Sequence, residues 1–332
     1  MKQLKLRNSG LQIPSLSLGT WSFGGDAIWG ETDEKQAVRT VHCAVELGMV
    51  QIDTAPAYGM GRSEEILGKA LIGIRDKVTL STKCGLNWEV GAEGSLHVER
   101  DGHRIVRNLS AVAIRRDLEN SLRRLHTDYI DIYYTHWPVP EPYNVPVQET
   151  LEELGRMKKE GKIRAIGASN MTAELLEEYL QYGDVEILQE KYSLLDRRPE
   201  EKLLGICREK EIVLQAYSPL EQGLLTEKFR NNKEPLHERR FAGKIWEKKE
   251  NRVRLRSMLD GWQDLYEKYR CGLEQLAIAW LLEQGKINVL CGARKPDHLE
   301  SNIRGADLEL MSGDIDRIRR DLEDLQVIPI LS

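Results

Sequence analysis

Eight short runs rich in β-branched and apolar residues recur along the 332-residue chain, and stretches with helical periodicity separate them. The runs cover residues 16–21, 50–55, 78–84, 129–136, 163–169, 186–193, 212–219 and 287–293. The helical stretches include 33–47, 112–125, 147–159, 173–180 and 200–210. Parallel strands need a long connection between them, so this alternation predicts a parallel sheet with helical crossovers. Eight units favour a closed (β/α)8 TIM barrel of the α/β class over an open doubly wound sheet.

The N-terminal segment is expected to form a β-hairpin in addition to the eight units. Residues 2–13 alternate apolar and polar side chains around Asn8-Ser9-Gly10, which is typical of two strands joined by a turn. We expect this hairpin to close the N-terminal end of the barrel. Because no linker or composition shift divides the sequence, residues 1–332 are predicted to form a single domain.

Two connections exceed the usual few residues, namely 85–110 after the third strand and 220–251 after the seventh. Both are therefore expected to be long βα loops. In a barrel such loops lie at the C-terminal face, where active sites are built. The sequence thus places a functional site at that face.

The charge balance argues against a nucleic-acid partner, because 48 basic and 53 acidic residues give a net charge of −5. Five cysteines lie far apart, so no paired spacing indicates a zinc site or a redox couple. The start of the chain lacks a signal peptide's apolar run, and no run approaches the ~20 apolar residues that span a bilayer. We expect a cytoplasmic protein without a metal or membrane partner, and the sequence carries no signal for its oligomeric state.

Four polar residues lie at the ends of three successive predicted strands. Asp53 and Tyr58 follow the second strand, Lys83 ends the third and His136 ends the fourth. Taken singly, Asp53 suits a helix cap, and Tyr58 or His136 suits a packed core. Barrel geometry, however, brings strand-end side chains together, so the four are predicted to form one catalytic set.

This combination suits the reduction of a carbonyl group. A phenol with a pKa of about 10 donates a proton poorly at neutral pH. The ammonium of Lys83 favours the phenolate and is predicted to lower the pKa of Tyr58, while Asp53 keeps that ammonium charged and oriented. A neutral His136 donates a hydrogen bond to the carbonyl oxygen and fixes its position.

Several segments carry a resemblance to a known family. They are IDTAPAYGMGRSEEILGKAL around Asp53 and Tyr58, STKCG around Lys83, YYTHWP around His136, then IRAIGASN, LQEKYSLLDR, AYSPLEQGLL and CGARKPDHLESN. In this order they resemble the aldo-keto reductases over essentially the whole chain, and they are most similar to the bacterial branch with methylglyoxal and sugar-aldehyde reductases. The resemblance implies reduction of aldehydes or ketones by NADPH, NADH being possible, with Asp53, Tyr58, Lys83 and His136 as a tetrad and Tyr58 as general acid.

The resemblance also implies a set of binding residues. Ser169, Asn170 and Gln189 would hold the nicotinamide carboxamide, and Tyr217 would stack on its ring. Along the pyrophosphate and adenosine we expect Ser218, Leu220, Gln222, Gly223, Gly292, Arg294, His298 and Asn302. Gly19, Thr20, Trp21, Asp53, Pro219 and Lys228 complete the cofactor set. The expected substrate-binding residues are Trp21, Tyr58, Trp88, His136 and Trp137.

Two positions depart from the family's NADPH-using pattern, which often has Arg or Gln in place of His298 and Gly in place of Glu227. A carboxylate near a pyrophosphate is repulsive unless Lys228 offsets it or the loop turns it outward. Arg294 is the remaining candidate ligand for a 2′-phosphate. Residues 228–256 hold eleven Lys or Arg and four Glu, which favours a dianionic ligand and hence NADPH, although a solvated helix face has the same composition.

Gly59-Met60-Gly61 is similar to a Rossmann dinucleotide loop because it follows a strand and precedes a helix. Glu64, however, occupies the position of the third glycine, where a carboxylate is poorly placed beside a pyrophosphate. We therefore expect the cofactor at the loops after the seventh and eighth strands.

Two other functions remain open from the sequence. A barrel lyase would use Lys83 as a Schiff-base nucleophile. A nicotinamide-binding regulatory subunit, like the relatives that are potassium-channel β subunits, would keep the fold and act by contact.

Overall fold

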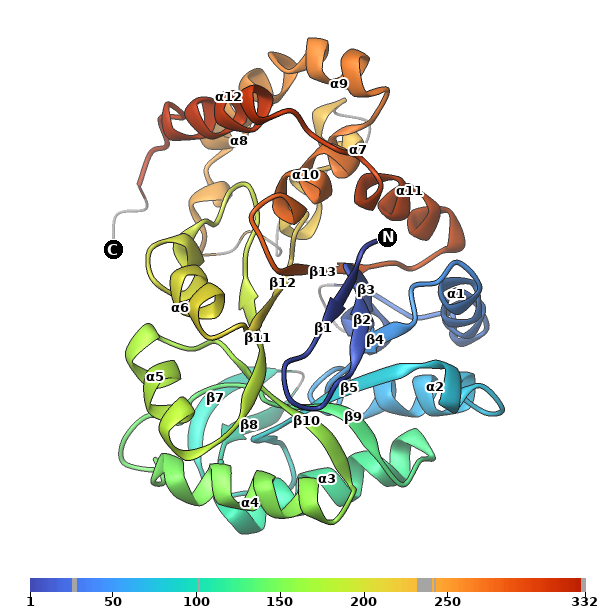
Figure 1. Cartoon of the computed structure of the whole chain (residues 1–332), viewed down its shortest axis with the longest axis vertical. Helices are drawn as coiled ribbons and strands as arrows, with labels where there is room; N and C mark the ends of the chain where they lie inside the picture. The colour runs from blue at the N-terminus through green and yellow to red at the C-terminus, as the bar shows by residue number, and fades with distance from the viewer. Residues whose placement is uncertain (26–28, 101, 232–240, 242, 330–332) are drawn as a thin grey trace.

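Eight parallel strands form a closed barrel at the centre of the computed structural model (Figure 1). The structure describes residues 1–25, 29–100, 102–231, 241 and 243–329. The barrel strands are β3 (Leu16–Gly19), β4 (Gln51–Asp53), β5 (Thr79–Cys84), β9 (Ile130–Thr135), β10 (Ile163–Ser169), β11 (Val185–Lys191), β12 (Val213–Tyr217) and β13 (Ile287–Gly292). Neighbours in the barrel follow chain order, and β13 pairs with β3 to close it. The predicted barrel is confirmed, and every expected run contains or overlaps one of these strands.

Helices surround the barrel (Figure 1). They are α1 (Glu34–Glu46), α2 (Arg62–Ala70), α3 (Ala111–Leu125), α4 (Val147–Lys159), α5 (Ala173–Tyr182), α6 (Leu203–Glu209), α7 (Glu227–Arg230), α8 (Lys249–Asp260), α9 (Gln263–Tyr269), α10 (Leu273–Leu282), α11 (Pro296–Ala306) and α12 (Ser312–Glu323). Short 3-10 turns include η1 (Trp21–Phe23), η2 (Arg75–Lys77), η3 (Arg198–Glu200), η4 (Glu221–Gly223) and η6 (Ile245–Glu247). In the described part of the chain, no helix combines the length and the apolar character that crossing a membrane requires.

Helix α3 shows why these segments are helical and how they cover the barrel. Its buried residues Ile114, Leu118, Leu122 and Leu125 recur every three or four positions and therefore share one face. Ser110 caps the helix, because its hydroxyl accepts a hydrogen bond from the backbone N–H of Ala113. The apolar face belongs to the large hydrophobic core of the barrel and its helices.

The predicted N-terminal hairpin is confirmed and lies across one end of the barrel (Figure 1). Strands β1 (Gln3–Lys5) and β2 (Gln12–Pro14) pair antiparallel. Leu6, Leu11 and Ile13 are buried in a cluster that also contains Ile132 and Val213 of the barrel strands. The hairpin therefore closes the N-terminal end and leaves the C-terminal end for the site.

The first long connection is more ordered than the expected loop. It forms a three-stranded antiparallel sheet of β6 (Leu86–Asn87), β7 (Ser95–Arg100) and β8 (His103–Arg107). The sequence pattern missed this sheet because its strands are short, half-exposed and rich in charged residues. The second connection contains η4, α7, η6 and the start of α8, while residues 232–240 and 242 of this basic segment lie outside the described residues.

A buried ion pair ties α2 and α3 to the barrel. Glu64 of α2 is fully buried, and its carboxylate accepts hydrogen bonds from Thr82 Oγ1 of β5 (2.6 Å) and from Arg124 Nε of α3 (2.6 Å). A buried carboxylate is tolerated when it is both paired and hydrogen-bonded, as it is here. The contact thereby holds the start of α2, which directly follows the loop that carries Tyr58.

We expect Arg124→Met to lower the free energy of unfolding by about 3 kcal/mol, because the substitution leaves the Glu64 carboxylate buried without its cation. Chemical denaturation followed by circular dichroism measures the change. Arg123→Met is the matched control, since Arg123 is exposed and hydrogen-bonds to Glu119 and Asn120 of its own helix. Equal stability of the two variants would contradict the assignment.

Candidate active site

A cavity of about 920 Å³ opens at the C-terminal end of the barrel. Five of its lining residues are the last residues of barrel strands, namely Gly19, Asp53, Ser169, Tyr217 and Gly292. Strands β7 and β8 and the segments that follow β3, β12 and β13 supply other parts of the lining. Side chains that are far apart in the sequence therefore meet at one opening.

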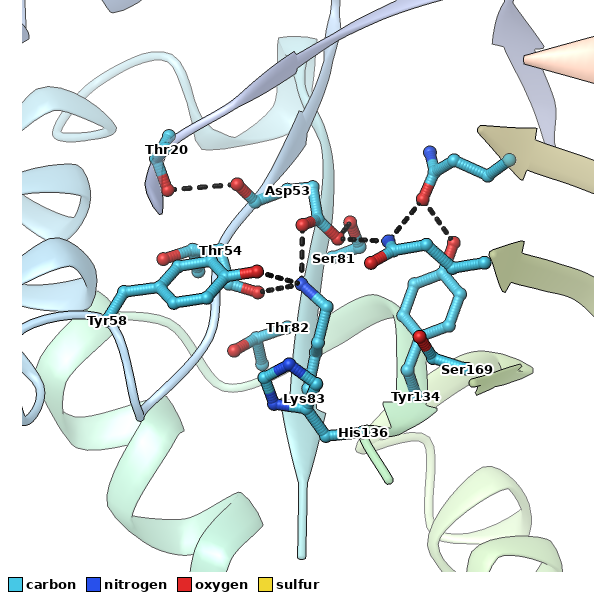
Figure 2. A network of polar contacts seen from close by, with 12 residues as sticks. Thr20, Asp53, Thr54, Tyr58, Ser81, Thr82, Lys83, Tyr134, His136 and Ser169 are labelled. Carbon is cyan, nitrogen blue, oxygen red and sulfur yellow. Dashed lines mark hydrogen bonds and ion pairs between the residues drawn. The ribbon is translucent and has the colours of Figure 1, made fainter. Parts of the chain in front are cut away.

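Lys83 is the centre of the predicted tetrad. Its ammonium is fully buried and donates hydrogen bonds to Asp53 Oδ1 (2.5 Å), to the carbonyl oxygen of Thr54 (2.8 Å) and to the hydroxyl of Tyr58 (3.2 Å). Figure 2 shows Asp53 and Tyr58 pointing toward this nitrogen from β4 and the loop after it. The three partners use all the donors of the ammonium, so its position is closely determined.

Asp53 is held by a second set of donors on the side away from Lys83. Its Oδ2 accepts hydrogen bonds from Ser81 Oγ (2.9 Å) and from Gln189 Nε2 (3.0 Å). Its backbone carbonyl accepts from Thr20 Oγ1 at 2.9 Å. The carboxylate is therefore buried, ionically paired and fully hydrogen-bonded, which is the condition for keeping a charge in a barrel interior.

The surroundings keep Lys83 charged and Tyr58 protonated at neutral pH. Burial disfavours the lysine charge, but Asp53 and Tyr58 outweigh that effect and raise the pKa of Lys83. Burial raises the pKa of Tyr58; Lys83 lowers it in part, and Asp53 adds to the rise. The prediction from the sequence that Lys83 lowers the pKa of Tyr58 below its usual value is wrong. Burial raises this pKa by more than Lys83 lowers it.

His136 follows β9 and faces Tyr58, with the two ring centres 6.0 Å apart. Its backbone is fixed on both sides, since its N–H donates to the carbonyl of Cys84 and its own carbonyl accepts from Asn170 Nδ2 (2.8 Å). Burial, with smaller contributions from Lys83 and other nearby cations, holds the pKa of His136 well below its usual range. The imidazole is therefore neutral at physiological pH, as a hydrogen-bond donor to a carbonyl oxygen requires.

A close backbone approach between Gly24 and Gly59 holds the loop of Tyr58. A Cβ atom on Gly24 would lie 2.6 Å from the carbonyl carbon of Tyr58 and 2.6 Å from the nitrogen of Gly59. Gly59 has a φ of +63°, and a Cβ there would lie 2.2 Å from the carbonyl oxygen of Gly24. Gly59, the first glycine of the Rossmann-like segment in the sequence, thus serves backbone packing beside the predicted tetrad.

The residues expected around a nicotinamide lie on the next strands of the barrel. Ser169 ends β10, Gln189 lies in β11 and Tyr217 ends β12. Asn170 links them to the tetrad, because its Oδ1 accepts from the hydroxyl of Tyr217 (2.8 Å) and its Nδ2 donates to the carbonyl of His136. This corner of the cavity therefore presents amide and hydroxyl groups next to an aromatic ring.

Every residue of the expected cofactor set lines the cavity: Gly19, Thr20, Trp21, Asp53, Ser169, Asn170, Gln189, Tyr217, Ser218, Pro219, Leu220, Gln222, Gly223, Lys228, Gly292, Arg294, His298 and Asn302. Glu227 is not among the lining residues. Its carboxylate accepts hydrogen bonds from Arg230 Nη2 (2.9 Å) and from the backbone N–H of Leu273 (3.0 Å). The loop thus turns this carboxylate away from the cavity, which removes the repulsion considered from the sequence.

The expected substrate wall requires one correction. Trp21, Tyr58, His136 and Trp137 line the cavity, but Trp88 does not. Trp88 follows β6, and its ring lies beside the guanidinium of Arg124 in α3, 6.0 Å from ring centre to Cζ.

Several further residues of the wall were missed from the sequence, among them Trp29, His97, Arg100 and Ile105. Trp29 lies between η1 and α1 and meets Trp21 edge to face at 5.4 Å between ring centres, and the other three belong to the small sheet of β7 and β8. No sequence signal identified them, because contacts between distant segments of the chain bring them to the cavity.

The chain is thus a (β/α)8 barrel with one large cavity, which is lined by a tyrosine hydrogen-bonded to a buried, charged lysine and by a neutral histidine. In the described part of the chain, no group of three or more His, Cys, Asp or Glu is arranged to hold a metal ion. Comparison with known proteins agrees with this class. Residues 15–323 match the model of the Aldo/keto reductase family, and the chain belongs to that family.

Individual relatives extend over almost the whole chain. An NADH-specific methylglyoxal reductase of Escherichia coli K12 is 42% identical over 329 residues, which are 98% of this chain and 100% of that protein. The solved glycerol dehydrogenase of Gluconobacter oxydans is 30% identical with a TM-score of 0.86, covering 99% of this chain and 97% of that one. An aldo-keto reductase of Klebsiella pneumoniae, solved in complex with NADPH, is 26% identical with a TM-score of 0.72, covering 96% and 95%.

Gly24→Ala is expected to lower kcat/KM for carbonyl reduction by about 100-fold, because the added methyl group displaces the backbone of Tyr58 and misplaces its hydroxyl. Steady-state kinetics with an aldehyde measures the effect. Gly155→Ala is the control, since no atom lies within 4 Å of its added Cβ. Normal activity of a folded Gly24→Ala variant would show that the contact does not position Tyr58.

Proposed function

We propose that this protein reduces aldehydes or ketones to alcohols with hydride from a reduced nicotinamide dinucleotide, and that Tyr58 is the general acid. The observation that carries the proposal is the hydroxyl of Tyr58, held 3.2 Å from a buried, charged Lys83 beside a neutral His136. Such a group donates a proton to a developing alkoxide and is assisted by the adjacent cation as it does so. The E. coli relative's name, methylglyoxal reductase, supports a small carbonyl substrate.

The chemistry of the cavity fits a dinucleotide. Ser169, Asn170 and Gln189 present the amide and hydroxyl groups that pair with a carboxamide, and Tyr217 offers a ring for stacking. At the other end Lys228, Arg294 and Lys295 place cations along the lining, as a pyrophosphate requires. The volume of about 920 Å³ lies at the upper end of ordinary ligand pockets, so it also leaves room for a small substrate.

Each residue of the tetrad then has a distinct role in the proposed reaction. His136 and Tyr58 donate hydrogen bonds to the substrate's carbonyl oxygen and orient the carbonyl carbon toward the nicotinamide corner. The reduced nicotinamide, when bound, supplies the hydride. Tyr58 gives its proton to the oxygen, and the resulting negative charge on the phenolate is stabilised by Lys83, which Asp53 holds in place.

The lyase alternative requires a neutral, accessible amine at Lys83. The nitrogen is fully buried, hydrogen-bonded to three oxygens, and its pKa is raised rather than lowered. Schiff-base lysines need the opposite environment, one that favours the neutral amine. The geometry therefore favours the reductase over the lyase.

We propose a cytoplasmic, single-domain protein. The five cysteines are all free in the structure, which is usual in a reducing compartment. One closed barrel draws its strands from Leu16 to Gly292, and this supports a single folding unit.

The choice of cofactor depends on Arg294 and Glu274. Arg294 donates from Nη1 to the carbonyl of Trp29 (2.8 Å) and from Nη2 to that of Glu31 (2.8 Å). A 2′-phosphate would have to compete for this guanidinium within a cavity that Glu274 also lines. The excess of basic residues over 228–256 favours NADPH, and the Klebsiella complex with NADPH supports that choice. The contacts of Arg294, the presence of Glu274 and the NADH-specific E. coli relative support NADH instead. We propose NADH as the preferred donor.

The first test of the proposal is Tyr58→Phe. We expect this variant to keep its affinity for the reduced cofactor and to lose at least about 100-fold in kcat for aldehyde reduction, because the proton donor is absent. Cofactor fluorescence titration measures binding, and loss of absorbance at the reduced nicotinamide band measures turnover. Near-normal turnover by Tyr58→Phe would show that Tyr58 is not the general acid. A wild-type protein that binds the reduced cofactor but oxidises it with no aldehyde would favour the regulatory-subunit function.

The second prediction concerns the cofactor. We expect kcat/KM for NADH to exceed that for NADPH by about tenfold, and Glu274→Gln to narrow this ratio because it removes a negative charge from the cavity. Parallel assays with both cofactors and one aldehyde measure the ratio. Glu283→Gln, which makes the same charge change at an exposed site, is expected to leave it unchanged. A wild-type preference for NADPH would refute this prediction and restore the choice made from the sequence.

A further inference from the structure

A β-bulge in strand β7 aims a second histidine into the cavity. Leu96 pairs with Val106 and Val98 pairs with Ile105, so His97 is an extra residue on this strand. In a regular strand, consecutive side chains point to opposite faces, yet His97 and Val98 both line the cavity. Bulges beside functional sites re-aim side chains in this way. The backbone therefore directs the imidazole of His97 toward the substrate end.

The neighbours of His97 determine which ring nitrogen carries the proton. Arg107 Nε donates a hydrogen bond to His97 Nδ1 (3.0 Å), and Arg107 Nη1 is itself anchored on the carbonyl of Pro138 (3.0 Å). Burial, together with Arg107 and Arg100, lowers the pKa of His97 to about 4. The ring is therefore neutral at physiological pH, and because Nδ1 accepts a hydrogen bond, the proton resides on Nε2.

This imidazole lies in the same part of the cavity as the tetrad. Its ring packs against Trp137, with 5.1 Å between ring centres, and Trp137 directly follows His136. His97 and His136 both line this cavity. Among the described residues, no protein acceptor is hydrogen-bonded to His97 Nε2, so this donor is available to a bound molecule.

We propose that His97 Nε2 donates a hydrogen bond to a second oxygen of the substrate, on the carbon next to the carbonyl that is reduced. The preferred substrate class is thus carbonyls with an oxygen on the adjacent carbon, such as 1,2-dicarbonyls and 2-hydroxyaldehydes. The proposal rests on the proposed function. The hydride adds to one carbonyl carbon, Tyr58 supplies the proton to its oxygen, and the second oxygen leaves the reaction unchanged.

The apolar neighbours of His97 make this donor selective. Leu86, Val98 and Ile105 line the same region, and they offer no alternative acceptor. A simple aldehyde would cover the N–H without pairing it, and an unpaired buried donor costs binding energy. A substrate with a second oxygen within reach of His97 Nε2 is therefore expected to have a kcat/KM about tenfold above that of a simple aldehyde, which is the effect of one hydrogen bond.

The test compares methylglyoxal with propanal, which has the same three-carbon chain but lacks the second oxygen. In His97→Phe, which keeps a ring against Trp137 and deletes the donor, the preference for methylglyoxal over propanal in kcat/KM is expected to fall about tenfold. The value for methylglyoxal falls because its hydrogen bond is lost, whereas the value for propanal does not fall, because propanal no longer covers an unpaired N–H. Retained propanal reduction also shows that the variant is folded. His97→Gln, which restores an N–H donor, is expected to recover part of the preference.

Two results would overturn the proposal. An equal fall for both substrates in His97→Phe would mean that His97 only supports the pocket by packing. Unchanged kinetics for both would mean that the donor does not reach the substrate. Both results differ from a failure of the proposed function. If the wild-type protein reduced neither methylglyoxal nor propanal, the proposed carbonyl reduction itself would be contradicted.

Discussion

The ion pair between Lys83 and Asp53 is the interaction on which the active site depends. Both groups are buried, so each loses several kcal/mol of hydration that only well-placed partners recover. The pair and its partners come from three barrel strands, β4, β5 and β11, and from the loop after β4. The partners are Thr54, Tyr58, Ser81 and Gln189. Closing the barrel is therefore also what makes the charged pair tolerable, and Lys83 in turn holds the hydroxyl of Tyr58, which lines the cavity.

The polar contacts continue from Asp53 through the barrel interior to the hairpin. Gln189 donates to Gln215, Gln215 donates to Asn288, and Asn288 donates to the carbonyl of Pro14 at 2.7 Å. A buried polar network stabilises a unique arrangement only when its members are satisfied. Here it aligns strands β11, β12 and β13 with the start of the barrel, so the carboxylate at one end is connected to the hairpin that closes the other.

In the proposed reaction, substrate recognition belongs to the connections and proton transfer belongs to the barrel. Strand ends and the segments that directly follow them carry the four residues of the predicted tetrad. The sheet of β6, β7 and β8 adds part of the wall, and its bulge brings His97 into the cavity. A family with one chemistry can thus change its substrates by changing this sheet, because the sheet contacts the cavity without supplying a partner of Lys83.

The barrel, the closing hairpin and the meeting of Asp53, Tyr58, Lys83 and His136 could be predicted from the amino-acid sequence, because periodicity and strand-end position are local properties of the chain. Three outcomes could be seen only in the folded chain: burial outweighs Lys83 in its effect on the pKa of Tyr58, Trp88 lies beside Arg124, and the carboxylate of Glu227 turns away from the cavity. The position of His97 is a fourth. These outcomes depend on desolvation and on contacts between distant segments, and no local pattern of residues encodes either.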